Sequence, residues 1–174
     1  YQSRVGKDTL ADMLAQLIRD SGKTCHLVTM SKPLYEIASS VQLALGATTV
    51  EKRPALMQEL ADAVKKSYGP DIFARVAFAP YLRGVAIPDY VIVTDFRFKS
   101  EYGTACLAFG KPTTVRIMRT DRAIDRPQTH TSETELADWP FDHTVDNNGD
   151  MTTLREQAAA LYQSLGSTQP ALQL

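Results

Sequence analysis

The chain has little of several features that mark common protein classes. Its only cysteines, Cys25 and Cys106, lie in apolar surroundings, so we expect buried thiols in a reducing compartment, the cytoplasm, rather than a disulfide or a metal site. The histidines, His26, His130 and His143, lack the spacing of metal ligands. No hydrophobic run approaches the ~18 residues of a membrane span. A net charge of −1 argues against binding of a nucleic-acid polymer.

The length and patterning instead predict a globular α/β protein. The 174 residues are enough for one domain with its own core, and a hydrophobic content of 44% is typical of such domains. Helix and strand patterns alternate along the chain, which predicts a three-layer fold, with a parallel sheet and helices on both of its faces. We expect one domain over residues 1–165 and a disordered tail over 166–174.

The expected elements follow from hydrophobic periodicity and from glycine and proline positions. We expect helices at residues 10–19, 33–45, 53–67, 71–82, 100–109 and 151–165, and a short helix from Ser132. We expect strands at residues 24–30, 90–95, 113–118 and 143–146. The strand at 90–95 is continuous, apolar and β-branched, which predicts that it is buried on both faces.

The most informative motif is Gly6-Lys7-Asp8-Thr9, at the start of an amphipathic helix. A Gly-Lys step there offers backbone N–H groups, a helix dipole and an ammonium group to the phosphates of a nucleotide. The full phosphate-loop pattern has glycine at the position of Tyr1 and serine or threonine at position 8, so an ordinary helix start is the alternative. A phosphate loop normally follows a buried strand. We therefore expect the natural chain to have such a strand before Tyr1.

Polar residues at the ends of the expected strands suggest the rest of a site. Asp95 ends the strand at 90–95, where ligands collect in α/β sheets. Together with a phosphate loop, such a carboxylate predicts Mg²⁺ binding, directly or through water; the alternative is a cap on the following helix. Several arginines could converge on this edge and bind phosphate, although each alone could be a solvated surface residue. They are Arg53, Arg75, Arg83, Arg97, Arg119, Arg122 and Arg126.

Six short motifs, in order along the whole chain, resemble the phage-type deoxynucleoside monophosphate kinases. They are Gly6-Lys7-Asp8-Thr9, Ser31-Lys32-Pro33-Leu34, Tyr68-Gly69-Pro70-Asp71, the segment 93–101, His130-Thr131-Ser132-Glu133 and Asp146-Asn147-Asn148-Gly149. The resemblance implies Mg²⁺-dependent transfer of the γ-phosphoryl group of ATP to a deoxynucleoside 5′-monophosphate. It also implies the P-loop nucleoside-monophosphate-kinase fold, whose strand order, 2-3-1-4-5, would place a leading strand at the centre of the sheet.

The resemblance implies roles on the ATP side of the site. Lys7 grips the β- and γ-phosphates, and Gly6, Asp8 and Thr9 complete the cradle. Asp95, Asp8 and Thr9 are the candidates for contacting Mg²⁺. The turn Asn147-Asn148-Gly149 resembles the turn that holds the adenine of ATP in related kinases, and an ordinary Asn-Gly turn at a helix start is the alternative.

The resemblance also implies an acceptor site and a lid. Arg97 and Glu101 lie on the substrate side in this resemblance. We expect Lys32, Arg53, Arg75 and His130 to bind the substrate with them. The segment 119–133 resembles a lid, in which Arg119, Arg122 and Arg126 neutralise charge as the phosphoryl group transfers. We expect His130 to orient this lid.

Two other functions fit the same motifs. A related small-molecule kinase, of the dephospho-coenzyme A or phosphomevalonate type, would share the loop and the fold. A non-catalytic nucleotide-binding module would have kept the altered loop as a remnant. The partners expected from the sequence are small-molecule nucleotides, and a homodimer is compatible with it.

Overall fold

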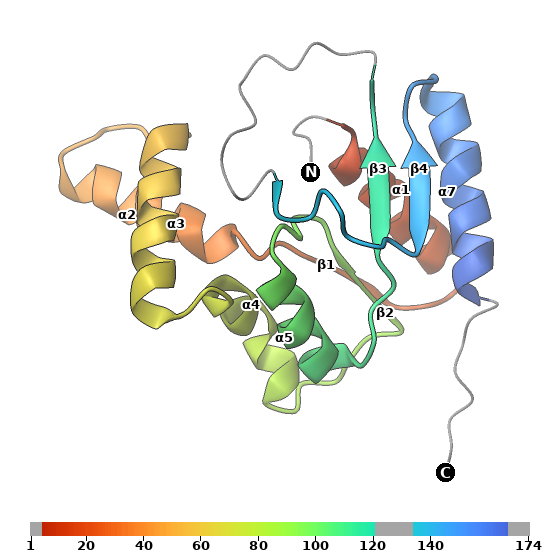
Figure 1. Ribbon diagram of the computed structural model, residues 1–174, viewed down its shortest axis with the longest axis horizontal. Helices are drawn as coiled ribbons and strands as arrows, with labels where there is room; N and C mark the ends of the chain where they lie inside the picture. The colour runs from red at the N-terminus through yellow and green to blue at the C-terminus, as the bar shows by residue number, and fades with distance from the viewer. Residues whose placement is uncertain (1–4, 121–133, 167–174) are drawn as a thin grey trace. The chain divides into compact units, whose positions relative to one another are not determined.

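The computed structural model describes residues 5–120 and 134–166, which fold as a mixed α/β protein (Figure 1). The elements in chain order are α1 (Lys7–Asp20), β1 (Cys25–Val28), α2 (Lys32–Ala44), α3 (Pro54–Tyr68), α4 (Ile72–Leu82), β2 (Tyr90–Val93), α5 (Lys99–Phe109), β3 (Val115–Met118), β4 (His143–Asp146) and α7 (Met151–Gly166). Each helix and strand expected within these residues is present. The short helix expected from Ser132 begins outside them.

The chain divides into two compact units. The first, called here the sheet unit, comprises Tyr1–Leu27, Ile87–Thr94 and Thr113–Leu174. The second, the helical unit, comprises Val28–Ala86 and Asp95–Pro112. The single domain expected over residues 1–165 stays a prediction.

The four described strands form two separate pairs, β1 with β2 and β3 with β4. The second pair is parallel, with Val115 opposite His143 and Met118 opposite Asp146. The expected three-layer arrangement around one sheet is therefore not seen in the described part of the chain. The four residues of β2 are only half-buried, so the expectation of a strand buried on both faces is wrong. Among the described residues, β1 is the only strand that pairs with β2.

Reciprocal Thr–Asp contacts begin both strand pairs. Before β1 and β2, the backbone N–H and hydroxyl of Thr24 donate to the Asp89 carboxylate at 2.7 and 2.6 Å, and the Asp89 N–H donates back to the Thr24 hydroxyl at 2.9 Å. Thr114 and Asp142 make the same three contacts before β3 and β4. The hydrogen bonds from Thr24 lower the pKa of Asp89. Each contact set fixes where its two strands start relative to each other.

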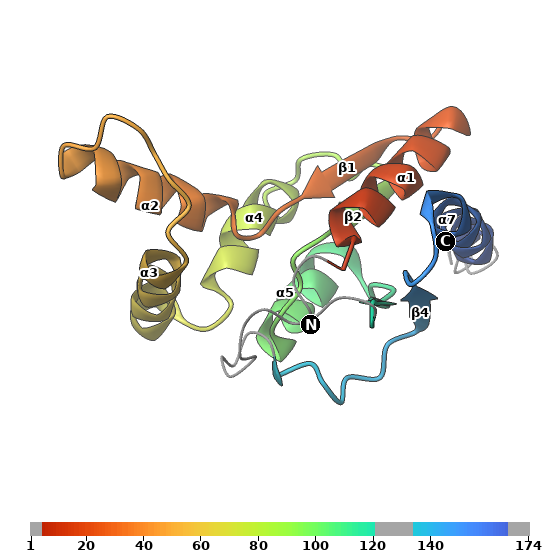
Figure 2. The same cartoon turned by 90° about the horizontal axis from the view of Figure 1, so that it is seen from above.

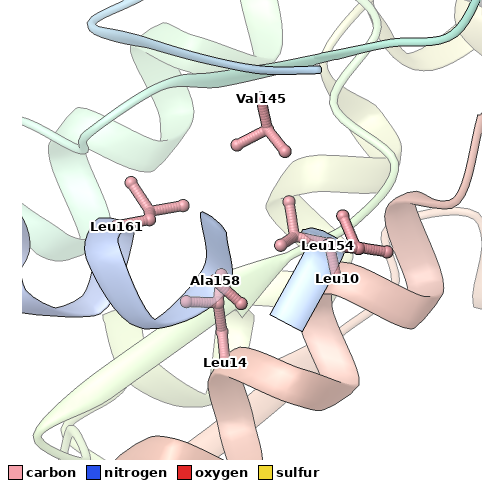
Figure 3. Close-up of a cluster of buried hydrophobic side chains, with 6 residues drawn as sticks. All are labelled: Leu10, Leu14, Val145, Leu154, Ala158 and Leu161. Atoms are coloured by element: carbon pink, nitrogen blue, oxygen red, sulfur yellow. The ribbon is translucent and has the colours of Figure 1, made fainter. Parts of the chain in front are cut away.

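The core of the sheet unit lies between α1, α7 and the strands. Its buried side chains point toward one another in Figure 3, and they are Leu10, Leu14, Val145, Leu154, Ala158 and Leu161. Leu10, Leu14 and Ile18 recur every four residues along α1, which places them on one face of the helix. α7 runs beside β4 in both views (Figures 1 and 2).

The outer edge of β4 is closed by a side chain. The Gln157 amide on α7 accepts a hydrogen bond from the Asp146 N–H at 3.0 Å and donates one to the Asp146 carbonyl at 2.6 Å. Gln157 thus gives Asp146 the two bonds that a neighbouring strand would otherwise give.

The helical unit packs α2 against α3 and α4 against α5 (Figure 2). Phe78 on α4 is almost fully buried. The Phe109 ring on α5 meets the rings of Phe78 and Tyr81 edge-on, each at a centroid distance of 5.1 Å. Across the residues described for both units, no helix has the length and apolar character needed to span a bilayer.

Candidate functional site

The phosphate-loop motif forms the beginning of α1. Gly6 precedes the helix with a left-handed φ of 92°, and α1 starts at Lys7, three residues earlier than expected. The Leu10 N–H donates to the Gly6 carbonyl at 2.9 Å and closes the first turn. The first N–H groups of a helix point out of its end and suit an anion. Gly6, Lys7, Asp8 and Thr9 therefore lie together at one helix terminus.

The Lys7 and Asp8 side chains lie close to each other at this terminus. The Lys7 ammonium is 3.4 Å from the Asp8 carboxylate, and the side chains are 24% and 73% exposed, respectively. Because Asp8 is mostly in water, this ion pair is weak. This contact with Asp8 therefore costs little free energy to break.

The turn after β4 contacts this loop. The side chain of Asn147 is buried, and its Nδ2 donates to the Val5 carbonyl at 2.7 Å. The Asn148 Oδ1 accepts hydrogen bonds from the N–H and the hydroxyl of Thr120, at 2.7 and 2.9 Å. Both amides thus have partners within the protein, and adenine binding by Asn147, Asn148 and Gly149 stays a prediction.

Asp95 follows β2 and is buried. One carboxylate oxygen accepts the Met30 N–H at 2.9 Å and the other accepts the Ser31 N–H at 2.7 Å. These donors lie at the start of α2, whereas α5, the helix that follows Asp95, begins at Lys99. The alternative to the expected Mg²⁺ role, a cap on the following helix, is therefore wrong. The contact also explains why β1 ends at Val28, because Met30 and Ser31 bond to Asp95 instead of continuing a strand.

Glu101 is a second buried carboxyl group in the helical unit. Its Oε2 accepts hydrogen bonds from the N–H groups of Arg97 and Phe98, at 2.7 and 2.9 Å, which caps the start of α5. Burial raises the pKa of Glu101 to about 7, even though these N–H groups and the charge of Lys65 lower it. The nearby Asp95 carboxylate adds to the increase.

Replacing Glu101 with glutamine should remove a pH dependence of stability. Because the pKa rises from 4.5 in the unfolded chain to about 7 in the folded protein, the folded state binds more protons between these values. The free energy of unfolding therefore falls as pH rises through this window, by on the order of 3 kcal/mol. In Glu101→Gln the amide oxygen can still accept both N–H groups, and this part of the fall should disappear.

Urea unfolding of both proteins at pH 5 and pH 8 measures the difference. Every other titrating group is common to the two proteins and cancels in the comparison. Equal pH dependence of the parent and Glu101→Gln would show that the carboxyl group titrates normally.

The basic residues expected at the acceptor site are spread over the helical unit. Lys32 is exposed at the start of α2. The Arg53 guanidinium is 3.8 Å from the Glu51 carboxylate. Arg75 donates to the Tyr68 carbonyl and lies 3.3 Å from the Asp71 carboxylate. Arg75 thus holds the turn before α4, a role that sequence reasoning did not predict.

A groove of about 430 Å³ lies between α2 and α3. Val41, Leu45 and Leu56 contribute apolar surface to it, and Arg53 contributes a guanidinium group. The Gln42 amide, also in the lining, is bonded to both backbone groups of Glu51. The groove therefore combines an apolar wall with one cationic side chain.

The expected site residues divide between the two units. The sheet unit holds Arg119 of the expected lid and the ATP-side residues Gly6, Lys7, Asp8, Thr9, Asn147, Asn148 and Gly149. The helical unit holds Asp95 and the acceptor-side set, namely Lys32, Arg53, Arg75, Arg97 and Glu101. Arg122, Arg126 and His130, and with them nearly all of the expected lid, lie outside the described residues.

Comparisons of the sequence with known proteins do not assign the chain to a family. No protein-family model matches the chain, and no curated protein matches it. Its function is therefore inferred from its residues and their arrangement.

Proposed function

We propose that this protein is an ATP- and Mg²⁺-dependent kinase that phosphorylates deoxynucleoside 5′-monophosphates. The observation that carries the proposal is the start of α1, where a left-handed Gly6 leads directly into a helix whose first residue is Lys7. This arrangement puts N–H groups, the positive end of the helix dipole and an ammonium group at one point. A triphosphate is the ligand that best matches all three.

The pairing of the strands supports the kinase fold. If a leading strand is counted first, β1, β2, β3 and β4 become the second to fifth strands. The order 2-3-1-4-5 then requires that β1 pairs with β2 and that β3 pairs with β4, as they do. The leading strand would run between β2 and β3 and would cover the half-buried residues of β2. We include this central strand, and the three-layer sheet that it completes, in the proposal.

The proposed reaction is an in-line phosphoryl transfer. An oxygen of the acceptor's 5′-phosphate forms a bond to the γ-phosphorus of ATP, while the bond from that phosphorus to the β–γ bridging oxygen breaks and ADP leaves. Lys7 neutralises the charge that develops on the bridging oxygen. Catalysis of this kind consists mainly of positioning and charge stabilisation.

Asp95 is suited to hold Mg²⁺ through a water molecule. Each of its oxygens accepts one backbone N–H, and a carboxylate has about four lone-pair sites, so acceptor capacity remains. No group of three or more His, Cys, Asp and Glu side chains forms a metal site in the described part of the chain. Mg²⁺ in kinases commonly needs no such group, because phosphates and water complete its coordination. The ion would neutralise charge on the phosphates.

The groove between α2 and α3 is our candidate for the acceptor. Its apolar wall suits a nucleobase, and Arg53 suits a phosphate. Because the Gln42 amide is bonded to Glu51, few polar groups are left in the lining to select one base over another. We therefore expect more than one base to be accepted.

A panel of acceptors tests the proposal. We expect ADP release from ATP and Mg²⁺ with at least one deoxynucleoside 5′-monophosphate, well above the rate without an acceptor. Dephospho-coenzyme A and phosphomevalonate should give only that background rate. ADP release with one of them alone would replace our proposal with the related kinase. Binding of ATP with no turnover on any acceptor would favour the non-catalytic module.

A further inference from the structure

The Asn147 amide occupies the space beside the phosphate loop. A Cβ atom added at Gly6 would lie only 2.4 Å from Asn147 Nδ2, closer than two such atoms can approach. Gly6 also has a φ of +92°, which L side chains rarely adopt. Glycine is therefore required at position 6 for two reasons, and one of them is the position of Asn147.

The Asn147 side chain is itself held firmly. Its backbone N–H donates to the Met118 carbonyl at 2.8 Å, which continues the ladder between β3 and β4 by one residue. The side chain is 6% exposed, and its Nδ2 donates to the Val5 carbonyl at 2.7 Å. The strand pair β3–β4 is thus joined through one buried amide to the residue before Gly6.

We propose that Asn147 is a positioning residue that keeps the phosphate loop in its phosphate-binding conformation. This inference rests on the proposed function, since it assigns to Asn147 a role in ATP binding that acts through Val5 and Gly6. Without the amide, the Val5 carbonyl would lose its buried donor, and the loop would sample conformations that direct its N–H groups elsewhere. Ordering the loop would then weaken ATP binding, as it does for any site that is not preorganised.

Binding of a non-hydrolysable ATP analogue to Asn147→Ala is the main test. We expect its affinity to fall by about tenfold or more, because loss of a buried hydrogen-bond partner is costly. In the kinase assay, KM for ATP should rise by a similar factor while KM for the acceptor stays constant. Asn147→Ser, which keeps a short donor, should lie between Ala and the parent, and it replaces the alanine variant if that variant does not fold.

Gln157→Ala is the matched control. Like Asn147, Gln157 has a side-chain amide that bonds to the backbone. Its partner, however, is Asp146 at the end of β4 and not the phosphate loop. Its affinity for the analogue should stay within about twofold of the parent, because it holds no part of the loop. Asn147 variants that stay folded and bind the analogue as tightly as the parent would overturn the inference.

A double-mutant cycle tests the contact independently of any kinase activity. Gly6→Ala should lower the free energy of unfolding strongly, and Asn147→Ala in the same chain should recover part of the loss by removing the clash. Additive effects of the two substitutions would also overturn the inference. A parent that binds the analogue without turnover would refute the proposed kinase activity alone. A parent that binds no analogue would refute nucleotide binding, and the cycle would still decide whether Asn147 holds the loop.

Discussion

Replacement of Lys7 with alanine should abolish phosphoryl transfer and leave the protein folded. The Asp8 carboxylate beside Lys7 is 73% exposed, so the ion pair between the two side chains contributes little to stability. In the transition state, by contrast, the ammonium would face the charge that builds up between the β- and γ-phosphates. We expect turnover to fall by on the order of 10³-fold.

Lys111→Ala is the control for this variant. Lys111 is an exposed lysine, and it belongs to none of the motifs. Initial rates of ADP release and thermal unfolding should be measured for both variants in the full-length chain. Turnover of Lys7→Ala within a few-fold of the parent would contradict the assignment of the phosphate loop.

Asp95→Asn should have the second-largest effect, and for two separable reasons. The substitution removes the charge that would hold Mg²⁺, which should lower the rate by on the order of 10²-fold. It also replaces one acceptor oxygen by an NH₂ group that faces the N–H of Met30 or Ser31. This second effect should cost about 1–3 kcal/mol of stability.

A Mg²⁺ titration separates the two effects. Loss of a metal-binding carboxylate should raise the Mg²⁺ concentration needed for half-maximal rate, whereas loss of a structural bond alone should not. Asp89→Asn is the matched control, because the Asp89 carboxylate, like that of Asp95, accepts a backbone N–H. Its donor is Thr24, at the start of the β1–β2 pair. It should lower stability and leave the Mg²⁺ dependence unchanged. The same half-saturation in Asp95→Asn and the parent would make Asp95 purely structural.

The sequence predicted the elements well because their signals are local. The spacing of Leu10, Leu14 and Ile18 is enough to specify an amphipathic helix, and glycine and proline mark where segments end. The reciprocal contacts of Thr24 with Asp89 were not predicted, because these residues are 65 positions apart. Strand bounds were too long for the same reason, since residues such as Met30 bond to distant side chains.

The residue types of the candidate site can be recognised in the sequence, but their arrangement cannot. Gly6 and Lys7 are recognisable from their sequence, and they lie together at the start of α1. The partners of Asp95 and Asn147 could not be predicted, since the bonds span 64 to 142 residues. Two observations could have suggested the Asp95 contact: Ser31-Lys32-Pro33 is a helix start directly after one strand, and Asp95 ends another. Neighbouring strands bring such ends together.

The hydrogen bonds between Gln157 and Asp146 affect how molecules of this protein can associate at high concentration. An open strand edge invites pairing with a strand from another molecule, and long edges of this kind lead to aggregation. On β4 the outward-facing groups of Asp146 are occupied by Gln157, and alternation leaves only Thr144 within the strand facing the same way. A single residue is too short to start a ladder. Copies that form a homodimer would therefore have to use a surface other than this edge.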